Sequence, residues 1–370
     1  MKILHVAQIL QGGVGAYLTE VVPAQVAALG ADNVVMLAAA DQRAYFPDAP
    51  PGIFRTFPSS RRSPRDLLRF ARAARLAILR ERPDIVHLHS SFAGMAVRSM
   101  PLPAPRSKIV YCAHGWSFNM RVAAWKRAAY ARIERLLTPA SDAIICISHA
   151  ERRDALARGL RADRLVTIHN GVRADPGPVP DRSALMDPAC LNLLFIGRLD
   201  TQKGFAVLHA AMRRLSGRPI HLHCVGAAVV SGDAALPPLP NITHHGWQAR
   251  EAVPGFIAAV DAVVVPSLWE GFGLAAAEAM RQGRPVIASA VDGLPELVRD
   301  GVSGYLVPPG DVDALTDRLA GLDRATLRRL GPTAQALFRD RFTAERMNAR
   351  ILALYVALLA DTPFRDDADG

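Results

Sequence analysis

The feature that most constrains this fold is the regular alternation of short β-branched, aliphatic runs with longer stretches rich in alanine and leucine, such as 17–29 and 64–82. Strands that alternate with helices in this way form parallel βαβ units. The alternation occurs in two series, whose expected strands are residues 3–6, 34–37, 85–88, 108–112, 143–147 and 165–168, then 191–196, 220–225, 262–265, 285–288 and 304–307. We therefore expect an α/β protein with two Rossmann-like domains.

The chain length agrees with this division, because 370 residues correspond to about two domains of ordinary size. Four prolines between Pro176 and Pro188 predict a stiff linker. The expected parts are an N-terminal domain (1–175), the linker (176–190), a C-terminal domain (191–343), an amphipathic helix (344–360) and a frayed acidic tail (361–370).

Composition narrows the class of protein. With 50% hydrophobic and 21% charged residues, the chain is too apolar to be disordered, and its net charge of +10 favours anionic partners. Its four cysteines are far apart, as expected of buried free thiols in a reducing compartment. Residues 1–7 lack the apolar core of a signal peptide, and no run is long enough to cross a bilayer. We expect a cytoplasmic protein whose membrane contact, if any, is peripheral.

Two glycine-containing segments predict ligand sites. Gly12, Gly13 and Gly15 lie between the first strand and a helix, where backbone amides can accept a phosphate, although the same letters also make a simple tight turn. In the second series, Arg198 and Lys203 follow a strand at the edge where α/β sheets bind ligands. A later strand runs through glycines into a helix flanked by Glu270 and Glu278, whose carboxylates can accept sugar hydroxyls over the helix start.

At this point the sequence resembles the retaining glycosyltransferases of family 4, which have the GT-B fold of two Rossmann-like domains facing across a cleft. The E-x7-E segment, from Glu270 to Glu278, is the most specific match. The other matching segments, in the order of the family, are Gly12 to Gly15, His114-Gly115-Trp116, Asn170-Gly171-Val172, Gly197 to Asp200 with Lys203-Gly204, and Asp292 to Glu296 preceding Gly304 to Val307. The resemblance also implies that the helix at 344–360 packs back on the N-terminal domain.

The resemblance implies a nucleotide-sugar donor and a role for each matched residue. Arg198 and Lys203 bind the diphosphate, Glu278 the ribose and Glu270 the sugar hydroxyls. The remaining donor contacts are the backbone amides of Phe272, Gly273 and Leu274, the loop at Gly12 and Gly13, and His114, which touches the sugar near the reacting carbon. Trp247 flanks the base, with uridine favoured over guanosine, although residues 227–232 depart from the usual glycine pattern there. His89, Ser90 and Trp116 are expected on the acceptor side.

Three segments could suggest a metal. Asp311-Val312-Asp313 matches the D-x-D of metal-dependent glycosyltransferases, but it follows Pro-Pro-Gly at a helix start, where Asp311 is expected to be an N-cap. The pairs His87/His89 and His221/His223 share a strand face, but no cysteine or carboxylate joins them at ligand spacing. We expect no metal and no cofactor, the nucleotide sugar being a substrate.

The excess positive charge is concentrated on helices. Ser63, Pro64 and Asp66 are the N-cap, first-turn proline and N3 acid of a helix to about Arg82. On its outer face, Arg65, Arg69, Arg72 and Arg80 alternate with Leu68, Leu76 and Leu79. A second basic and aromatic helix spans 121–137. Such faces are typical of a helix resting on an anionic bilayer, or simply of a solvated surface, and no nucleic-acid motif accompanies the charge.

These observations predict a hexosyltransferase that is metal-independent and transfers a sugar from a nucleotide donor, with retention, to a lipid-linked saccharide of a bacterial surface polysaccharide. It would act in the cytoplasm at the inner face of the plasma membrane. Two alternatives remain: a GT-B enzyme with a soluble small-molecule acceptor, and a homologue that binds nucleotide sugars without catalysis.

Overall fold

The computed structural model describes residues 1–46, 49–50, 52–58, 63–100, 107–227 and 236–364. The chain divides into two compact units. The first unit comprises Met1–Gly171 together with Ala344–Gly370, and the second unit comprises Val172–Thr343. The proline-rich residues 176–190 thus fall within the second unit, while the predicted departure at 228–232 lies outside the described residues.

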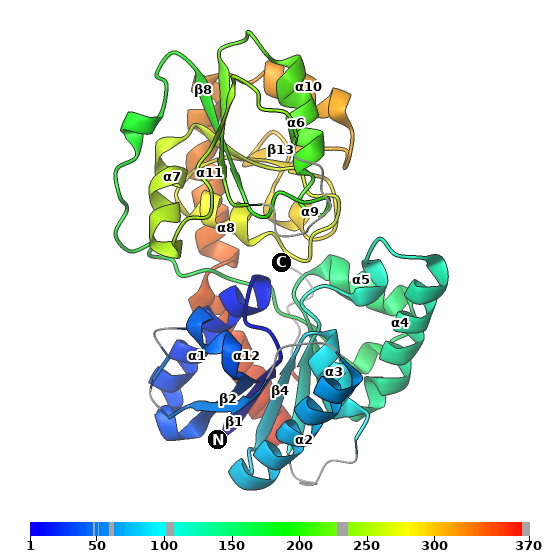
Figure 1. The fold of residues 1–370 in the computed structure, drawn as a ribbon. Helices are drawn as coiled ribbons and strands as arrows, with labels where there is room; N and C mark the ends of the chain where they lie inside the picture. Colours follow the sequence, from blue (N-terminus) through cyan, green and yellow to red (C-terminus); the bar gives the residue numbers. More distant parts are fainter. Residues whose placement is uncertain (47–48, 51, 59–62, 101–106, 228–235, 365–370) are drawn as a thin grey trace. The chain divides into compact units, whose positions relative to one another are not determined.

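The first unit is built on a parallel sheet that has seven strands within the described residues, in the order β3-β2-β1-β4-β5-β6-β7. The strands are β1 (Ile3–Ala7), β2 (Val34–Ala39), β3 (Phe54–Phe57), β4 (Ile85–His89), β5 (Lys108–Cys112), β6 (Ala143–Cys146) and β7 (Leu165–Thr167). Its α-helices are α1 (Gly13–Leu29), α2 (Pro64–Glu81), α3 (Ser91–Arg98), α4 (Ala124–Leu137), α5 (His149–Ala157) and α12 (Ala344–Leu359). In Figure 1, α1 and α12 lie on one side of this sheet and α2 and α3 on the other. The central strands are buried on both faces, which explains their continuous apolar runs.

The second unit has a parallel sheet whose described residues form six strands, in the order β10-β9-β8-β11-β12-β13. They are β8 (Leu191–Ile196), β9 (Ile220–Val225), β10 (Ile242–His244), β11 (Ala262–Val265), β12 (Val286–Ser289) and β13 (Gly304–Val307). The α-helices are α6 (Phe205–Arg214), α7 (Val253–Ala259), α8 (Leu274–Arg281), α9 (Leu294–Leu297), α10 (Val312–Ala320) and α11 (Arg324–Arg341). The prediction of an α/β fold with two Rossmann-like sheets is confirmed.

Strand order places one switch point in each sheet. In the first sheet β1 and β4 are neighbours, and the chain leaves them toward opposite edges of the sheet. In the second sheet β8 and β11 are neighbours in the same way. Ligands of open α/β sheets bind at the carboxyl ends of the strands beside such a switch point. The loops that follow β1, β4, β8 and β11 are therefore where a substrate site is expected.

Several local predictions are confirmed. The Ser63 hydroxyl accepts a hydrogen bond from the backbone N–H of Asp66 at the start of α2. At the start of α10, Asp311 Oδ1 accepts one from the N–H of Ala314 at 2.9 Å, so Asp311 is an N-cap. None of the described helices is both long and apolar enough to span a membrane.

Candidate active site

The two predicted cations of the second unit lie in the loop that follows β8. Lys203 Nζ donates to Glu270 Oε2 at 2.5 Å, and its side chain is 25% exposed. Arg198 Nη2 donates to Gln202 Oε1 at 2.6 Å and lies 3.1 Å from Asp200 Oδ2. Each cation therefore already faces an oxygen acceptor, and both remain accessible to an anion from solvent.

The loop after β11 brings the first carboxylate of the E-x7-E segment to the same place. Besides Lys203, the Glu270 carboxylate accepts the hydroxyl of Ser267 at 3.2 Å. The backbone N–H of Glu270 donates to Asp292 Oδ2 at 2.7 Å. Asp292 follows β12 and has a φ of 48°, a left-handed conformation that aspartate adopts more readily than most residues other than glycine. In this conformation its carboxylate holds the backbone of Glu270.

Two glycines make this arrangement of loops possible. At Gly204 (φ 67°) a Cβ atom would lie 1.9 Å from the carbonyl oxygen of Pro266, so only glycine allows the loops after β8 and β11 to approach so closely. At Gly273 (φ 105°), the N-cap of α8, a Cβ atom would lie 2.6 Å from Leu294 Cδ2. The N-terminus of α8 is thereby held next to Glu270.

The remaining predicted donor residues of the second unit lie on or beside α8, with one exception. Leu274 begins α8, Glu278 lies about one turn into it and is half-buried, and Phe272 precedes it with a buried ring. Trp247 lies instead in the segment after β10 and is 64% exposed, so its ring is accessible to a planar group such as a base. Contacts thus link Arg198, Lys203 and Glu270, through Asp200 and through the pair of Lys203 with Glu270. Trp247 lies in a different loop and contacts none of these three residues in the bonds described above.

Sequence reasoning assigned no role to the residues that orient these side chains. Asp200 contacts Arg198 and accepts the backbone N–H of Lys203 at 3.0 Å. The side chain of Gln202 accepts a hydrogen bond from Arg198, and the carboxylate of Asp292 accepts one from the backbone N–H of Glu270. Asp200 and Asp292 lie within segments that match the family, and this was the only sign of their role in the sequence. Their contacts could not be predicted, because they depend on the conformation of the loops.

In the first unit, the glycine loop after β1 leads directly into α1. Gly12 is the N-cap of α1 with a φ of 85°, and both Gly12 and Gly13 are exposed. A Cβ atom on either glycine would meet nothing within 4 Å. The space over the first turn of α1 is therefore open, as an approaching phosphate requires.

His114 follows β5 and is half-buried, with a left-handed φ of 55°. Its Nε2 is 3.1 Å from His89 Nδ1, and its ring meets the ring of Tyr17 edge-on with centroids 4.7 Å apart. Burial lowers the pKa of His114 to about 3, so the imidazole is neutral at physiological pH. Ser90, after the neighbouring strand β4, is also left-handed (φ 79°) and partly exposed.

Two acceptor-side predictions are wrong. His89 is 0% exposed because it shares a face of β4 with His87, where His87 contacts Tyr355 of α12 and His89 contacts His5, which in turn contacts Gln25 of α1. Trp116 is 2% exposed, donates its indole N–H to the carbonyl of Glu151 and stacks on Phe118. Neither side chain can contact an acceptor, which leaves Ser90 as the accessible member of the predicted set.

The two predicted histidine pairs lie in clusters of histidines, one in each unit. Ring nitrogens of His5, His87 and His89 lie within 4.8 Å of one another, and His5 was missing from the sequence prediction. His5 and His89 use two of these nitrogens in a hydrogen bond to each other at 3.0 Å. In the second unit His221 contacts Thr243, and His223 contacts His245 and Asn192. Each histidine of the two pairs makes at least one hydrogen bond, while the Nε2 of His87 has no partner within the described residues.

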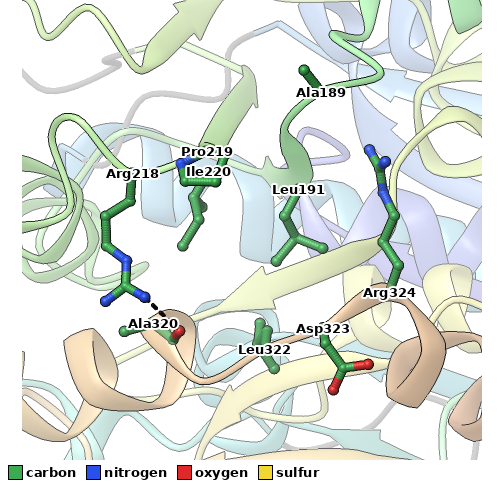
Figure 2. Close-up of a pocket in the computed structure, with 9 residues that line it drawn as sticks. All are labelled: Ala189, Leu191, Arg218, Pro219, Ile220, Ala320, Leu322, Asp323 and Arg324. Atoms are coloured by element: carbon green, nitrogen blue, oxygen red, sulfur yellow. Dashed lines mark hydrogen bonds between the residues drawn. The ribbon is translucent and has the colours of Figure 1, made fainter.

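A pocket of about 240 Å³ in the second unit lies elsewhere. Figure 2 shows it lined by Leu191 and Ile220, the first residues of β8 and β9, and by Leu322 and Arg324. It is therefore at the amino ends of the strands, opposite to the edge that carries Arg198 and Glu270. We do not assign the substrate site to it.

Comparison with known proteins identifies the family. The family model described as Glycosyltransferase Family 4 matches residues 11–175, and the one described as Glycosyl transferases group 1 matches residues 191–323. A 41.2 kDa protein of the cps region of Klebsiella pneumoniae is 32% identical over 243 residues, which cover 63% of this chain and 68% of that protein. The chain belongs to glycosyltransferase family 4.

Further relatives agree with this assignment. The α-maltose-1-phosphate synthase of Mycolicibacterium smegmatis is 30% identical over 272 residues, covering 65% of this glycosyltransferase and 68% of the relative. Among solved structures, Anabaena HepE in complex with UDP superposes with a TM-score of 0.81 at 20% identity, covering 96% of this chain and 100% of HepE. A sucrose-phosphate synthase from Thermosynechococcus elongatus gives a TM-score of 0.80 at 22% identity, with coverages of 98% and 100%. The fold is that of GT-B enzymes.

Proposed function

We propose that this family 4 glycosyltransferase transfers a hexosyl group from a nucleotide sugar, with retention of configuration, to a lipid-linked saccharide. One observation carries the donor part of the proposal: Lys203 contacts Glu270 just before the N-terminus of α8, and Arg198 lies in the same loop as Lys203, at the switch point of the second sheet. Cations and helix N–H groups suit a diphosphate, and a neighbouring carboxylate suits sugar hydroxyls.

The chemistry of transfer explains why these groups belong together. Breaking the bond between the sugar and the β-phosphate leaves positive charge on the sugar and an additional negative charge on the β-phosphate of the departing nucleotide. Preorganised cations at Arg198 and Lys203 stabilise that negative charge as it forms. Glu270 holds the sugar from the other side through its hydroxyls. Retention then follows from attack on the same face, with the leaving phosphate taking the proton of the acceptor hydroxyl, and His114 positions the sugar without acting as nucleophile.

The donor we favour is a UDP-sugar. HepE, whose fold this enzyme shares, has been solved with UDP and with UDP-glucose. The exposed ring of Trp247 offers a stacking surface for a base, and the half-buried carboxylate of Glu278 on α8 is a suitable acceptor for a ribose hydroxyl. A panel of UDP- and GDP-sugars, assayed for hydrolysis and thermal stabilisation, tests this choice. If the enzyme hydrolyses only GDP-sugars, the choice of base is contradicted. If it hydrolyses no nucleotide sugar in the panel, the non-catalytic alternative is favoured.

The acceptor we favour is lipid-linked, in surface polysaccharide synthesis at the inner face of the plasma membrane. Support comes from the Klebsiella relative of the cps region and from the surface of the first unit. On α2, Leu68 is 71%, Leu76 38% and Leu79 42% exposed among exposed arginines. On α4, Trp125 and Leu136 are 69% and 66% exposed. Apolar side chains among cations are the pattern of a helix that rests on an anionic bilayer.

A soluble acceptor is the second candidate, because specific relatives favour it. The α-maltose-1-phosphate synthase and the D-inositol 3-phosphate glycosyltransferase of Xylanimonas cellulosilytica, 34% identical over 257 residues, both carry a phosphorylated small molecule in their names. Activity that sediments with anionic vesicles favours the lipid-linked acceptor. Activity that stays in the supernatant favours the soluble one.

Removing three charges from α2 should abolish membrane binding without affecting donor hydrolysis. Changing Arg65, Arg69 and Arg72 to Gln keeps helix propensity but removes about 1 kcal/mol of surface attraction for each arginine. We expect co-sedimentation with phosphatidylglycerol vesicles to be lost, and any weak binding that remains to be less sensitive to salt than that of the wild type.

The matched control is the triple variant Arg213→Gln, Arg328→Gln and Arg329→Gln. It removes the same charge from exposed positions of the second unit. It should bind vesicles like the wild type. If the α2 variant also sediments normally, or if the wild type binds no anionic vesicles, α2 is a solvated surface and the soluble acceptor is favoured.

Activity should survive chelation, because Arg198, Lys203 and the start of α8 already provide positive potential for the leaving group. Asp311, the first acid of the D-x-D match, is committed to the cap of α10. We expect unchanged hydrolysis after EDTA treatment. A complete loss that Mn²⁺ or Mg²⁺ restores would contradict this proposal of metal independence.

A further inference from the structure

Within the first unit, a buried chain of hydrogen bonds leads to His114, and the roles given above do not use it. It begins at Gln25 on α1, where Oε1 is 2.7 Å from His5 Nε2. His5 Nδ1 is 3.0 Å from His89 Nε2, and His89 Nδ1 is 3.1 Å from His114 Nε2. Gln25, His5 and His89 are fully buried. Only the His114 end of this chain of hydrogen bonds reaches the surface.

Each imidazole in this chain carries a single ring proton. Burial lowers the pKa of His5 to about 4 and that of His114 to about 3. Burial and the neighbouring histidines also hold the pKa of His89 well below its usual range. A neutral imidazole has one N–H donor and one lone-pair nitrogen, so its two ring nitrogens cannot play the same role. The direction of the first hydrogen bond therefore determines the direction of all the others.

Gln25 sets that direction. Its carbonyl oxygen can only accept, so His5 carries its proton on Nε2 and accepts at Nδ1. His89 must then donate from Nε2 to His5, and His114 must donate from Nε2 to His89.

We propose that Gln25, acting through His5 and His89, fixes His114 in the tautomer that has its proton on Nε2 and its lone pair on Nδ1. This inference rests on the proposed place of His114 at the donor sugar. A lone pair at Nδ1 accepts a hydrogen bond and cannot donate one. His114 thus requires a hydrogen-bond donor from its ligand, such as a sugar hydroxyl, and Gln25, His5 and His89 are positioning residues for that contact.

The tautomer can be measured directly on the wild-type protein. Long-range ¹H–¹⁵N correlation spectra of ¹⁵N-histidine-labelled protein, assigned by single substitution, distinguish a protonated from a bare ring nitrogen. We expect the Nε2–H form for His5, His89 and His114. The Nδ1–H form at His114, or a resident metal found by elemental analysis with ring nitrogens in its ligand shell, would overturn the proposal. Neither readout depends on activity, so failure of the proposed function would appear separately, as absent donor hydrolysis.

Two variants test the control by Gln25. Gln25→Met removes the acceptor at similar volume, so His114 should become a mixture of tautomers and kcat for donor hydrolysis should fall about tenfold, the value of one hydrogen bond. Gln25→Glu keeps an acceptor, so the Nε2–H form should persist and rescue kcat.

The matched control is Tyr355→Phe, which removes a buried hydrogen bond at 2.6 Å to His87 Nδ1, outside the path to His114. It should leave the tautomer of His114 and kcat unchanged. A tautomer unchanged in Gln25→Met, or changed equally in Tyr355→Phe, would overturn the assignment.

Discussion

Replacing Lys203 or Arg198 with alanine should lower kcat/KM for the donor by a factor that corresponds to about 2 to 4 kcal/mol of transition-state stabilisation. The reason is the change in charge during the reaction, since the departing diphosphate gains a negative charge that these two cations meet in a partly dry site. Lys203 is the more enclosed, with 25% of its side chain exposed against 41% for Arg198. We expect the larger loss in Lys203→Ala.

The measurement is donor hydrolysis at several substrate concentrations, with circular dichroism to check the fold. Arg214→Ala is the matched control, because Arg214 is an exposed cation of the same unit that pairs with Asp313 away from the site. Its kcat/KM should equal that of the wild type. Near-normal turnover in Lys203→Ala or Arg198→Ala would remove the proposed phosphate role from that residue.

Acidification should destabilise the first unit strongly between pH 6.5 and pH 5. Burial keeps His5, His87, His89 and His114 neutral in the folded protein by lowering their pKa values, to about 4 for His5 and about 3 for His114. In the unfolded chain each has an ordinary pKa near 6.5 and takes up a proton below it. Their contribution to stability is therefore complete above pH 6.5 and declines as the pH falls toward the folded pKa values.

Each of these histidines should reduce the free energy of unfolding by up to about 1.4 kcal/mol per pH unit, so together they cost roughly 5 kcal/mol by pH 5.5. Urea unfolding followed by fluorescence and circular dichroism at pH 7, 6 and 5.5 measures this. A His5→Asn variant keeps a hydrogen-bonding group but should take up about one proton fewer on unfolding. A stability that does not change between pH 7 and 5.5 would contradict burial of these rings as neutral groups.

The sequence was sufficient for the central elements of the fold, and insufficient at the edges of the sheets. Strands such as β5 and β9 are long, apolar and bounded by clear turns, so their predicted limits match the structure. Strands β3 and β10 were missed. Both are edge strands of three or four residues with exposed side chains. A strand this short has too few positions to show an alternation of apolar and polar residues.

The site was predictable where it depends on spacing along the chain, and not where it depends on contacts made by folding. Glu270 and Glu278 are separated by fixed local geometry. In contrast, the contact between His87 and Tyr355 joins residues 268 positions apart. The error at His89 has the same origin, because its orientation follows from which helices cover that face of the sheet. No local pattern around His89 contains that information.

The packing of α12 on α1 has a consequence for how the protein is made. The Asn348 side chain donates to the carbonyl of Glu20, and Tyr355 completes the histidine layer over β4, yet both are synthesised after the whole second unit. At about 5 to 20 residues per second, the roughly 170 residues in between take about 10 to 30 s to translate. During that interval the part of the first unit that α12 covers, including the histidines over β4, remains exposed to solvent. The first unit can therefore complete its packing only after the second unit has been synthesised.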